Sequence, residues 1–200
     1  MAEKVKNRTL YHVTVSKPYK NEFTAGQIIK VGSTPNPFFA FYEGSRQYPV
    51  TQADGTVLQI NAVAFLRQVR DGHINCPQLA RIATELAMHY VMLVRELLME
   101  EIRRDEFPDA PSRQRCLYLC DTMEEARYWN GRLGEQGAKI CSLNLTGTLH
   151  RADARLLLGD SEPLSVTRDR GRSYWRGEVS TNPELETLFV GDAVVTEVGL

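Results

Sequence analysis

The stretch that decides the fold is Ser112–Gly137, SRQRCLYLCDTMEEARYWNGRLGEQG. It opens with a short apolar run, Cys116–Cys120, which predicts a β-strand. Thr122 and Glu125 follow at the spacing of a capping box, in which the hydroxyl accepts from the helix's third amide and the carboxylate reaches back to the cap amide. The stretch therefore predicts a strand, a tight turn and a helix in direct succession.

The predicted helix has one apolar face and a glycine where it should end. The residues of that face are Ala126, Trp129 and Leu133. Gly137 stands where a left-handed C-terminal cap belongs. Tyr118 on the strand and Tyr128 on the first turns of the helix then lie at one strand-to-helix junction, where α/β folds often bind small ligands. Both tyrosines also fit a plain role as half-buried core or rim aromatics.

The composition is that of an ordinary globular protein. The 200 residues are 42% hydrophobic and 24% charged, which suffices to bury a core, and we expect one domain over residues 1–200. The formal net charge of -1 gives no overall attraction to nucleic acid or to an anionic membrane.

The cysteines and the N-terminal residues bear on metal binding and location. No metal-ligand spacing occurs among the four cysteines, which are Cys76, Cys116, Cys120 and Cys141. We interpret them as small buried thiols in a reduced compartment and expect no metal site. Residues 1–8 are polar, and no stretch approaches the roughly 20 apolar residues that cross a bilayer. We therefore expect a cytoplasmic protein without a membrane partner.

Two strands are predicted near the N-terminus. Thr9–Ser16 alternates, so that His12 and Thr14 share one face, which is either solvent-facing or lines a site. Gly26–Gly32 is a second short strand bounded by glycines. The aromatic run Phe38–Tyr42 fits either the edge of a core or a wall beside a ligand.

Two helices follow over about residues 61–104. Ala62–Arg70 carries an apolar stripe and ends before Gly72, and Gln78–Arg104 is the longest periodic segment in the chain. Basic residues at the end of the long helix are interleaved with acidic ones, which argues against a helix that reads DNA.

The C-terminal part predicts a strand, a helix and a strand pair. Ala138–Leu145 alternates as a half-buried strand that Thr146–Gly147 turns, and Ser161–Gly177 has cap, proline and glycine signals of a helix. Glu184–Val198 predicts two short strands that break at Gly191. Strands at both ends of the chain with helices between them indicate an α+β fold.

Three features of this order together resemble the ADP-ribosyltransferase superfamily, in its His-Tyr-Glu branch with diphtheria toxin and the poly(ADP-ribose) polymerases. The first strand carries YHVT, the middle strand is followed by a second tyrosine on the next helix, and a glutamate opens a late strand. The residues of these motifs are His12 with Thr14, Tyr118 with Tyr128, and Glu186 with Glu184 as the alternative.

The resemblance implies a fold and a reaction. The fold is an ADP-ribosyltransferase-like split, mixed β-sheet with the 61–104 helical segment inserted before the central strand. The reaction cleaves the nicotinamide–ribose bond of NAD, the expected cofactor and substrate, through an oxocarbenium-like state. The toxins often have shorter helical segments at that place, so the N-terminal half matches the family less closely.

The resemblance also implies residue roles. Tyr118 and Tyr128 would sandwich the nicotinamide, and His12 and Thr14 would hydrogen-bond the adenosine ribose. Glu186 would stabilise the developing positive charge, because an apolar run follows it directly, with Glu184 as the fallback. The plain alternatives are solvated or satisfied side chains and, for the two glutamates, charges that protect a strand edge.

The guanidinium of Arg46 suits the pyrophosphate of NAD, and so does that of Arg113. The plain alternative for each of the two arginines, a solvated surface position, is the more common one for this residue type.

The function that follows is a mono-ADP-ribosyltransferase that moves ADP-ribose to a macromolecular acceptor, in the setting of an intracellular toxin or phage-conflict enzyme. An antitoxin or inhibitor protein would be a natural partner. The acceptor is open between protein and nucleic acid, and the basic run Arg168–Arg172 keeps nucleic acid in consideration. Alternatives are an NAD-binding module, an NAD glycohydrolase without an acceptor, and an interaction protein with a degenerate cleft.

Overall fold

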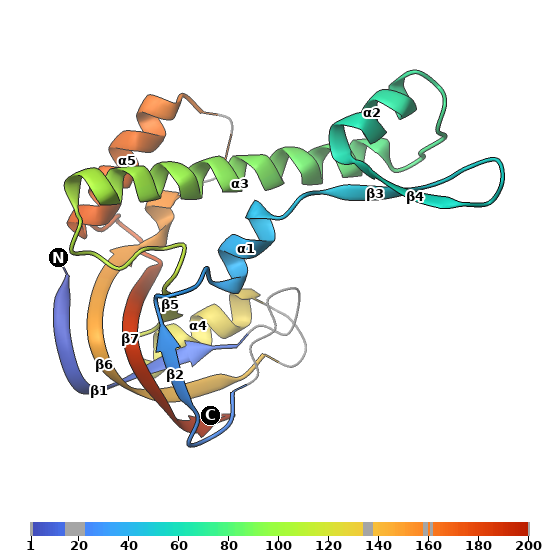
Figure 1. The fold of residues 1–200 in the computed structure, drawn as a ribbon. Coiled ribbons are helices and arrows are strands. Elements are labelled where there is room, and N and C mark those ends of the chain that lie inside the picture. The colour runs from blue at the N-terminus through green and yellow to red at the C-terminus, as the bar shows by residue number, and fades with distance from the viewer. Residues whose placement is uncertain (1, 15–22, 134–137, 158–159, 161, 200) are drawn as a thin grey trace.

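The computed structural model describes residues 2–14, 23–133, 138–157, 160 and 162–199. Strands and helices are interspersed along the chain without regular alternation, as in an α+β fold (Figure 1). The elements are β1 (Glu3–Val13), β2 (Ile28–Val31), α1 (Pro37–Glu43), β3 (Gln47–Thr51), β4 (Val57–Asn61), α2 (Ala62–Arg70), α3 (Leu79–Glu106), β5 (Leu117–Leu119), α4 (Met123–Leu133), β6 (Ile140–Asp153), the 3₁₀ turn η1 (Ala154–Leu157), α5 (Leu164–Arg176) and β7 (Leu185–Val198).

Two long strands, β6 and β7, form the centre of a five-stranded sheet. β1 pairs with the outer edge of β6, while β5 and β2 share the outer edge of β7, one along its first half and the other along its second. Every ladder between the described strands is antiparallel, so the expected mixed sheet is not observed. A mixed sheet needs a crossover connection that places two parallel strands side by side, and the described strands have none.

The sheet curls until its two edges meet. β1 bends at a bulge between Val5 and Arg8, where Asn7 has a left-handed φ of 56°. The bend carries the end of β1 to β5, and Tyr11 and Cys120 exchange two backbone hydrogen bonds of 3.0 and 2.8 Å. His12 is therefore beside β5, although more than a hundred residues separate the two along the chain. Residues 15 and 16 of the predicted first strand lie outside the described part of the chain.

Both long strands continue where the sequence predicts a break. Thr146–Gly147 does not turn β6, and Gly191 does not split β7; instead Gly147 and Gly191 face each other in the ladder. A Cβ on Gly147 would lie 2.2 Å from the carbonyl oxygen of Val190. The two glycines are thus a close backbone crossing between continuous strands rather than turn residues.

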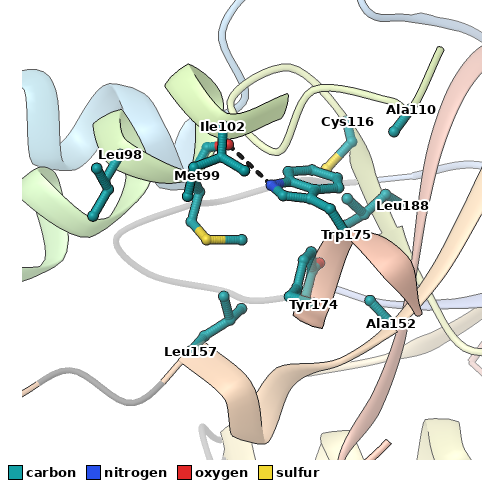
Figure 2. Packing of buried hydrophobic residues seen from close by; sticks show 10 residues of the cluster. All are labelled: Leu98, Met99, Ile102, Ala110, Cys116, Ala152, Leu157, Tyr174, Trp175 and Leu188. Atoms are coloured by element: carbon teal, nitrogen blue, oxygen red, sulfur yellow. Dashed lines mark hydrogen bonds between the residues drawn. The ribbon is translucent and has the colours of Figure 1, made fainter. Parts of the chain in front are cut away.

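A helical layer, formed by α3 and α5, packs on one side of the curled sheet (Figure 1). α3 runs across it, and α5 packs against the end of α3, where Gly171 leaves room for Ile102. Trp175 and Tyr174 are fully buried in this core, and the Trp175 indole donates to the carbonyl oxygen of Met99 at 3.0 Å (Figure 2). This core fixes α3 and α5 against the sheet.

The start of α4 largely matches its predicted cap. The amide of Glu125 donates to the Thr122 hydroxyl at 3.2 Å, as expected. The Glu125 carboxylate accepts from the amide of Asp121 at 2.9 Å, one residue earlier than predicted. Gly137, the predicted C-terminal cap, lies outside the described residues.

One helix and one hairpin were not predicted. The aromatic run forms α1, which is capped by the Asn36 side chain accepting from the Phe39 amide at 2.9 Å. The residues before α2 form the β3–β4 hairpin, which extends with α2 and the start of α3 well beyond the sheet (Figure 1). We call residues 47–86 the arm.

Candidate functional site

A pocket of about 800 Å³ lies between the helical layer and the curled sheet. Its walls come from the ends of β1 and β7, from β5, and from α1, α3, α4 and η1. Of the candidate residues from the sequence, five line the pocket: His12, Arg113, Tyr118, Glu184 and Glu186. Arg113 is buried there and is not a solvated surface residue. A volume of this size is typical of sites that bind nucleotide-sized ligands.

Tyr118 lies in the pocket wall at the centre of β5. Its hydroxyl donates to the backbone oxygen of Arg113 at 3.0 Å, which fixes the ring. The ring of Phe38 on α1 meets it edge-to-face at 6.1 Å, and the Arg113 guanidinium lies 5.3 Å from its centre. The result is a rigid aromatic wall backed by a cation.

His12 presents one free ring nitrogen within this wall. Its Nδ1 lies 2.8 Å from the carbonyl oxygen of Tyr118, so Nδ1 carries the proton that is donated. Nε2 is buried and has no hydrogen-bond partner among the described residues. Burial lowers the pKa of His12 to about 4 despite the bond to Tyr118, so the ring is neutral near pH 7. Nε2 is therefore a buried acceptor whose hydrogen-bonding capacity is unused among the described residues.

Glu186 is held at the pocket by a buried cation and a phenol. Its Oε1 accepts from Arg113 and, at 2.7 Å, from the Tyr174 hydroxyl. Both partners are almost fully buried, while Oε2 has no partner among the residues described. The carboxylate is thus fixed in position with one oxygen left for a ligand.

Arg113 connects this carboxylate to a second one. Glu96 on α3 is fully buried and accepts from Arg113 at 3.1 Å and from Arg95 at 2.7 Å. Burial alone would raise the pKa of Glu96, but the charges and hydrogen bonds of the two arginines hold it below its usual value. Burial would lower the pKa of Arg113, and the carboxylates of Glu186 and Glu96 raise it well above its usual value instead. Glu96 and Arg113 are therefore both charged, and each has oppositely charged partners within the cluster.

Glu184 lies at the pocket with a different set of partners. Its Oε1 is 2.7 Å from Arg132 of α4 and 3.2 Å from Arg155 of η1. The two guanidiniums are about half exposed and also line the pocket. The Glu184 amide donates to the buried carboxylate of Asp153 at 2.9 Å, which fixes the backbone before β7. Two cations with spare donors thus converge at one point of the pocket.

Three predicted site residues lie outside the pocket lining. The Thr14 hydroxyl accepts from the Lys139 amide at 2.9 Å and links two strand ends. Tyr128 is 47% exposed, and its hydroxyl accepts from Arg132 at 3.0 Å. Arg46 donates to Nδ1 of His89 at 3.1 Å and stacks over Phe41, away from the pocket.

The pocket also contains residues that the sequence did not single out. Trp129 lines it and donates from its indole to the carbonyl oxygen of Leu185 at 2.8 Å. The helical stripe that includes Ala126 and Leu133 already placed Trp129, and not Tyr128, on the inward face. Nothing in the local sequence marked Arg132 and Arg155, because their convergence on Glu184 is purely tertiary.

The basic run on α5 is neutralised by acidic neighbours. Arg168 pairs with Glu101 at 2.9 Å, Arg172 with Glu106 at 2.8 Å, and Arg170 with Glu162. These pairs remove the unbalanced positive face that would favour nucleic acid.

The described ranges contain neither a metal-ligand cluster nor a membrane-spanning helix. No group of three or more His, Cys, Asp or Glu side chains there is arranged to hold a metal ion. None of the helices in that part of the chain has the length and apolar character to cross a membrane. All four cysteines are free thiols, and three of them are buried.

The arrangement suits a ligand with a flat ring, hydroxyl groups and negative charge. Aromatic side chains can stack on the ring, His12 can accept from a hydroxyl, and Arg132 with Arg155 can bind an anion. A fixed carboxylate at Glu186 can stabilise a cation that develops during bond cleavage.

Comparison with known proteins gives a family without an assigned activity. A search of curated proteins finds no match to the chain. A family model described as "Protein of unknown function (DUF2441)" matches residues 10–198, from within β1 to the end of β7. The chain therefore belongs to the DUF2441 family.

Proposed function

We propose that this protein is a mono-ADP-ribosyltransferase of the cytoplasm with an ADP-ribosyltransferase-like fold. It transfers ADP-ribose from NAD to a macromolecular acceptor and releases nicotinamide. The observation that carries the proposal is that His12, Tyr118 and Glu186, predicted from three separate motifs, line one pocket. If the three motifs were unrelated, their residues would not be expected to line the same pocket.

The residue roles follow from the contacts. Tyr118 supplies the stacking surface for nicotinamide, with Trp129 as the second aromatic in place of Tyr128. His12 accepts from a ribose hydroxyl through Nε2. Glu186, fixed by Arg113, faces the positive charge that develops on the reacting ribose as the glycosidic bond breaks.

Arg132 and Arg155 are the cations best placed for the pyrophosphate. Both line the pocket and are half exposed, whereas Arg46 is engaged with His89 outside it. A diphosphate can accept from both guanidiniums at once, because planar guanidinium groups suit phosphate oxygens.

Neutralisation of the α5 basic run favours a protein acceptor over nucleic acid. An NAD glycohydrolase is the second candidate, since the same site would serve if water entered in place of an acceptor. In an intracellular toxin or phage-conflict role, an antitoxin or inhibitor protein would block this pocket.

The test is incubation of the purified protein with cell extract and NAD labelled in its adenylate half. We expect label on protein and release of nicotinamide, with both lost on Glu186→Gln. The matched control is Glu101→Gln, which removes an exposed carboxylate on α3 that does not line the pocket and should retain full activity. Circular dichroism of both variants separates loss of activity from loss of fold.

The outcomes distinguish the candidates. Nicotinamide release without labelled product identifies a glycohydrolase. Label on nucleic acid would replace the protein acceptor. If neither label nor nicotinamide appears and NAD gives no thermal stabilisation, the protein is not an NAD enzyme; a ligand at 100 times its Kd should stabilise by about 2.7 kcal/mol.

A further inference from the structure

The arm contains a strand edge that has no partner among the described residues. β3 and β4 form a two-stranded sheet, separate from the main sheet. Each strand of such a ribbon has one outer edge, whose amides and carbonyls point away from the ladder. An isolated hairpin of this kind is marginally stable at best in water, so a further strand at one of its edges would stabilise it.

The hydrogen-bond alternation fixes which groups point outward. Gln52 donates to Thr56 at one end of the hairpin, and Ala62 donates to Arg46 at the other. Both pairs belong to the same register, so bonded pairs alternate with non-bonded ones between them. On β4 the outward amides and carbonyls are therefore those of Val57, Gln59 and Asn61.

The two outer edges differ in protection. Pro49 lies at a non-bonded position of β3, opposite Gln59, and removes the central outward amide of that edge. β4 has the sequence VLQIN, with neither proline nor charge. Proline and charged side chains are the usual means by which proteins keep edges from pairing, and only β3 has one of them.

The side chains around the open edge are apolar and exposed. Val57 is 56% exposed, Leu58 46% and Val63, in the first turn of α2, 51%. Leu58 and Ile60 lie on the face of the ribbon that meets α2, where Tyr48 stacks on Phe65 at 4.8 Å. A strand added to β4 would extend this apolar face.

We infer that β4 pairs with β4 of a second copy of this chain, in an antiparallel and symmetric ladder centred on Gln59. In that register the five residues overlap completely, and Gln59 faces Gln59 of the other copy. Val57 meets Asn61, and Leu58 lies beside Ile60, so apolar side chains meet across the dyad. The two ribbons become one four-stranded sheet with an α2 helix of each copy on the same face.

Self-pairing is favoured over another partner because the strand is complementary to itself. The outward groups of Val57, Gln59 and Asn61 map onto one another under a twofold axis, and no charge opposes a like charge. Two five-residue strands bury less than the roughly 1,200 Å² of a standard interface, so we expect a concentration-dependent equilibrium between monomer and dimer.

The experiment is sedimentation velocity of the full chain over a wide range of concentrations. The wild type should shift from monomer to dimer as concentration rises. Gln59→Lys and Gln59→Glu should each remain monomeric, because like charges then face each other at the dyad. An equal mixture of the two variants should recover the dimer, which a folding defect cannot produce.

A proline pair tests the edge itself. Gln59→Pro removes the outward amide at the centre of β4 without removing a ladder bond, and it should abolish the dimer. Thr51→Pro makes the same kind of change on the outer edge of β3 and should leave the dimer intact. A wild type that is monomeric at every concentration, or a charge-swapped mixture that fails to associate, overturns the inference.

Discussion

At the residue scale, two glutamates separated by one residue have opposite surroundings. Glu186 is held by Arg113 and Tyr174, which are both buried. Glu184 is held by Arg132 and Arg155, which are both half exposed. Buried partners restrain a catalytic carboxylate, whereas exposed cations can exchange one anion for another. The two acids should therefore respond differently to the same substitution.

We expect Glu184→Gln to strengthen NAD binding and to keep nicotinamide release. The substitution removes the anion that occupies Arg132 and Arg155, so the pyrophosphate no longer competes with it. A gain of about 1 kcal/mol is typical of a single charge-assisted interaction and corresponds to about fivefold in Kd. Titration calorimetry with NAD measures it. Loss of cleavage with NAD binding retained would instead make Glu184 the carboxylate that stabilises the developing positive charge.

His12 makes folding stability depend on pH. Its pKa is lowered by burial from 6.5 to about 4, so the unfolded chain takes up a proton below about pH 6.5 and the folded chain only below about pH 4. Stability is therefore complete above pH 6.5 and falls as the pH drops through this window. Two and a half units correspond to about 3 kcal/mol, of which about 2 kcal/mol should be lost between pH 7 and pH 5.

We expect His12→Asn to remove that part of the acid sensitivity. An asparagine amide can still donate to the carbonyl oxygen of Tyr118, but it does not titrate. Urea unfolding at pH 7 and pH 5 should show a difference that is smaller than in the wild type by about 2 kcal/mol. His73→Asn, at an exposed position, should leave the difference unchanged. An unaltered pH response of His12→Asn would mean that this imidazole takes up its proton as readily in the folded protein as in the unfolded chain.

At the element scale, the close crossing of β6 and β7 limits what Gly147 can become. A Cβ at this position would meet the Val190 carbonyl at 2.2 Å and the Cα of Gly191 at 2.9 Å. Both are backbone atoms of the partner strand, which cannot rotate away as a side chain would. Any larger residue must separate the two central strands of the sheet.

We expect Gly147→Ala to lower the free energy of unfolding by about 3 kcal/mol, at the upper end of overpacking costs. Urea unfolding at neutral pH measures it. The matched control is Gly131→Ala on α4, where nothing lies within 4 Å of the added Cβ. That change should stabilise the protein by about 0.5–1 kcal/mol, because alanine favours the helix over glycine. If Gly147→Ala does not destabilise the protein more than Gly131→Ala, the two strands have room for a Cβ at this position and the prediction is wrong.

The helices were more predictable from the sequence than the strands. α2 has the predicted bounds, α3 differs from its predicted bounds by one or two residues, and α5 ends at Gly177 in the left-handed conformation. Helix signals are local, since caps and periodicity lie within the element. The same local signals indicated a turn at Gly147, because close approach of a partner strand cannot be seen from one strand alone.

At the scale of the whole molecule, the sequence identified those pocket residues that lie on strands and belong to short local motifs. His12, Tyr118 and Glu186 lie on separate strands that the curled sheet brings to one pocket. Arg95, Arg132 and Arg155 could not be predicted, since each reaches the pocket through tertiary packing of a helix or turn. Arg46 and Thr14 have suitable chemistry in the sequence, but local contacts engage them elsewhere.

The side chain of Arg113 joins segments that are distant in the chain. It donates to Glu96 of α3, to Glu186 of β7 and to the Tyr174 hydroxyl of α5. Its backbone oxygen accepts from the Tyr118 hydroxyl and from the Asn36 side chain at 2.7 Å. The helical layer, the sheet and one wall of the pocket therefore meet at a single buried cation.

We expect Arg113→Met to lower the free energy of unfolding by about 3–5 kcal/mol, because it leaves Glu96 and Glu186 buried with an excess of negative charge. Adding Glu96→Gln to Arg113→Met should recover part of that loss, because one of the two stranded charges disappears. The control is Arg115→Met, whose exposed side chain donates only to the Ser33 carbonyl among the described residues, and which should change stability by less than about 0.5 kcal/mol. Urea unfolding of the wild type, Arg113→Met, Glu96→Gln and the double variant gives the coupling energy between Arg113 and Glu96 directly. If Arg113→Met and Arg115→Met prove equally mild, the buried cluster does not need the Arg113 charge, and this account of its stability is wrong.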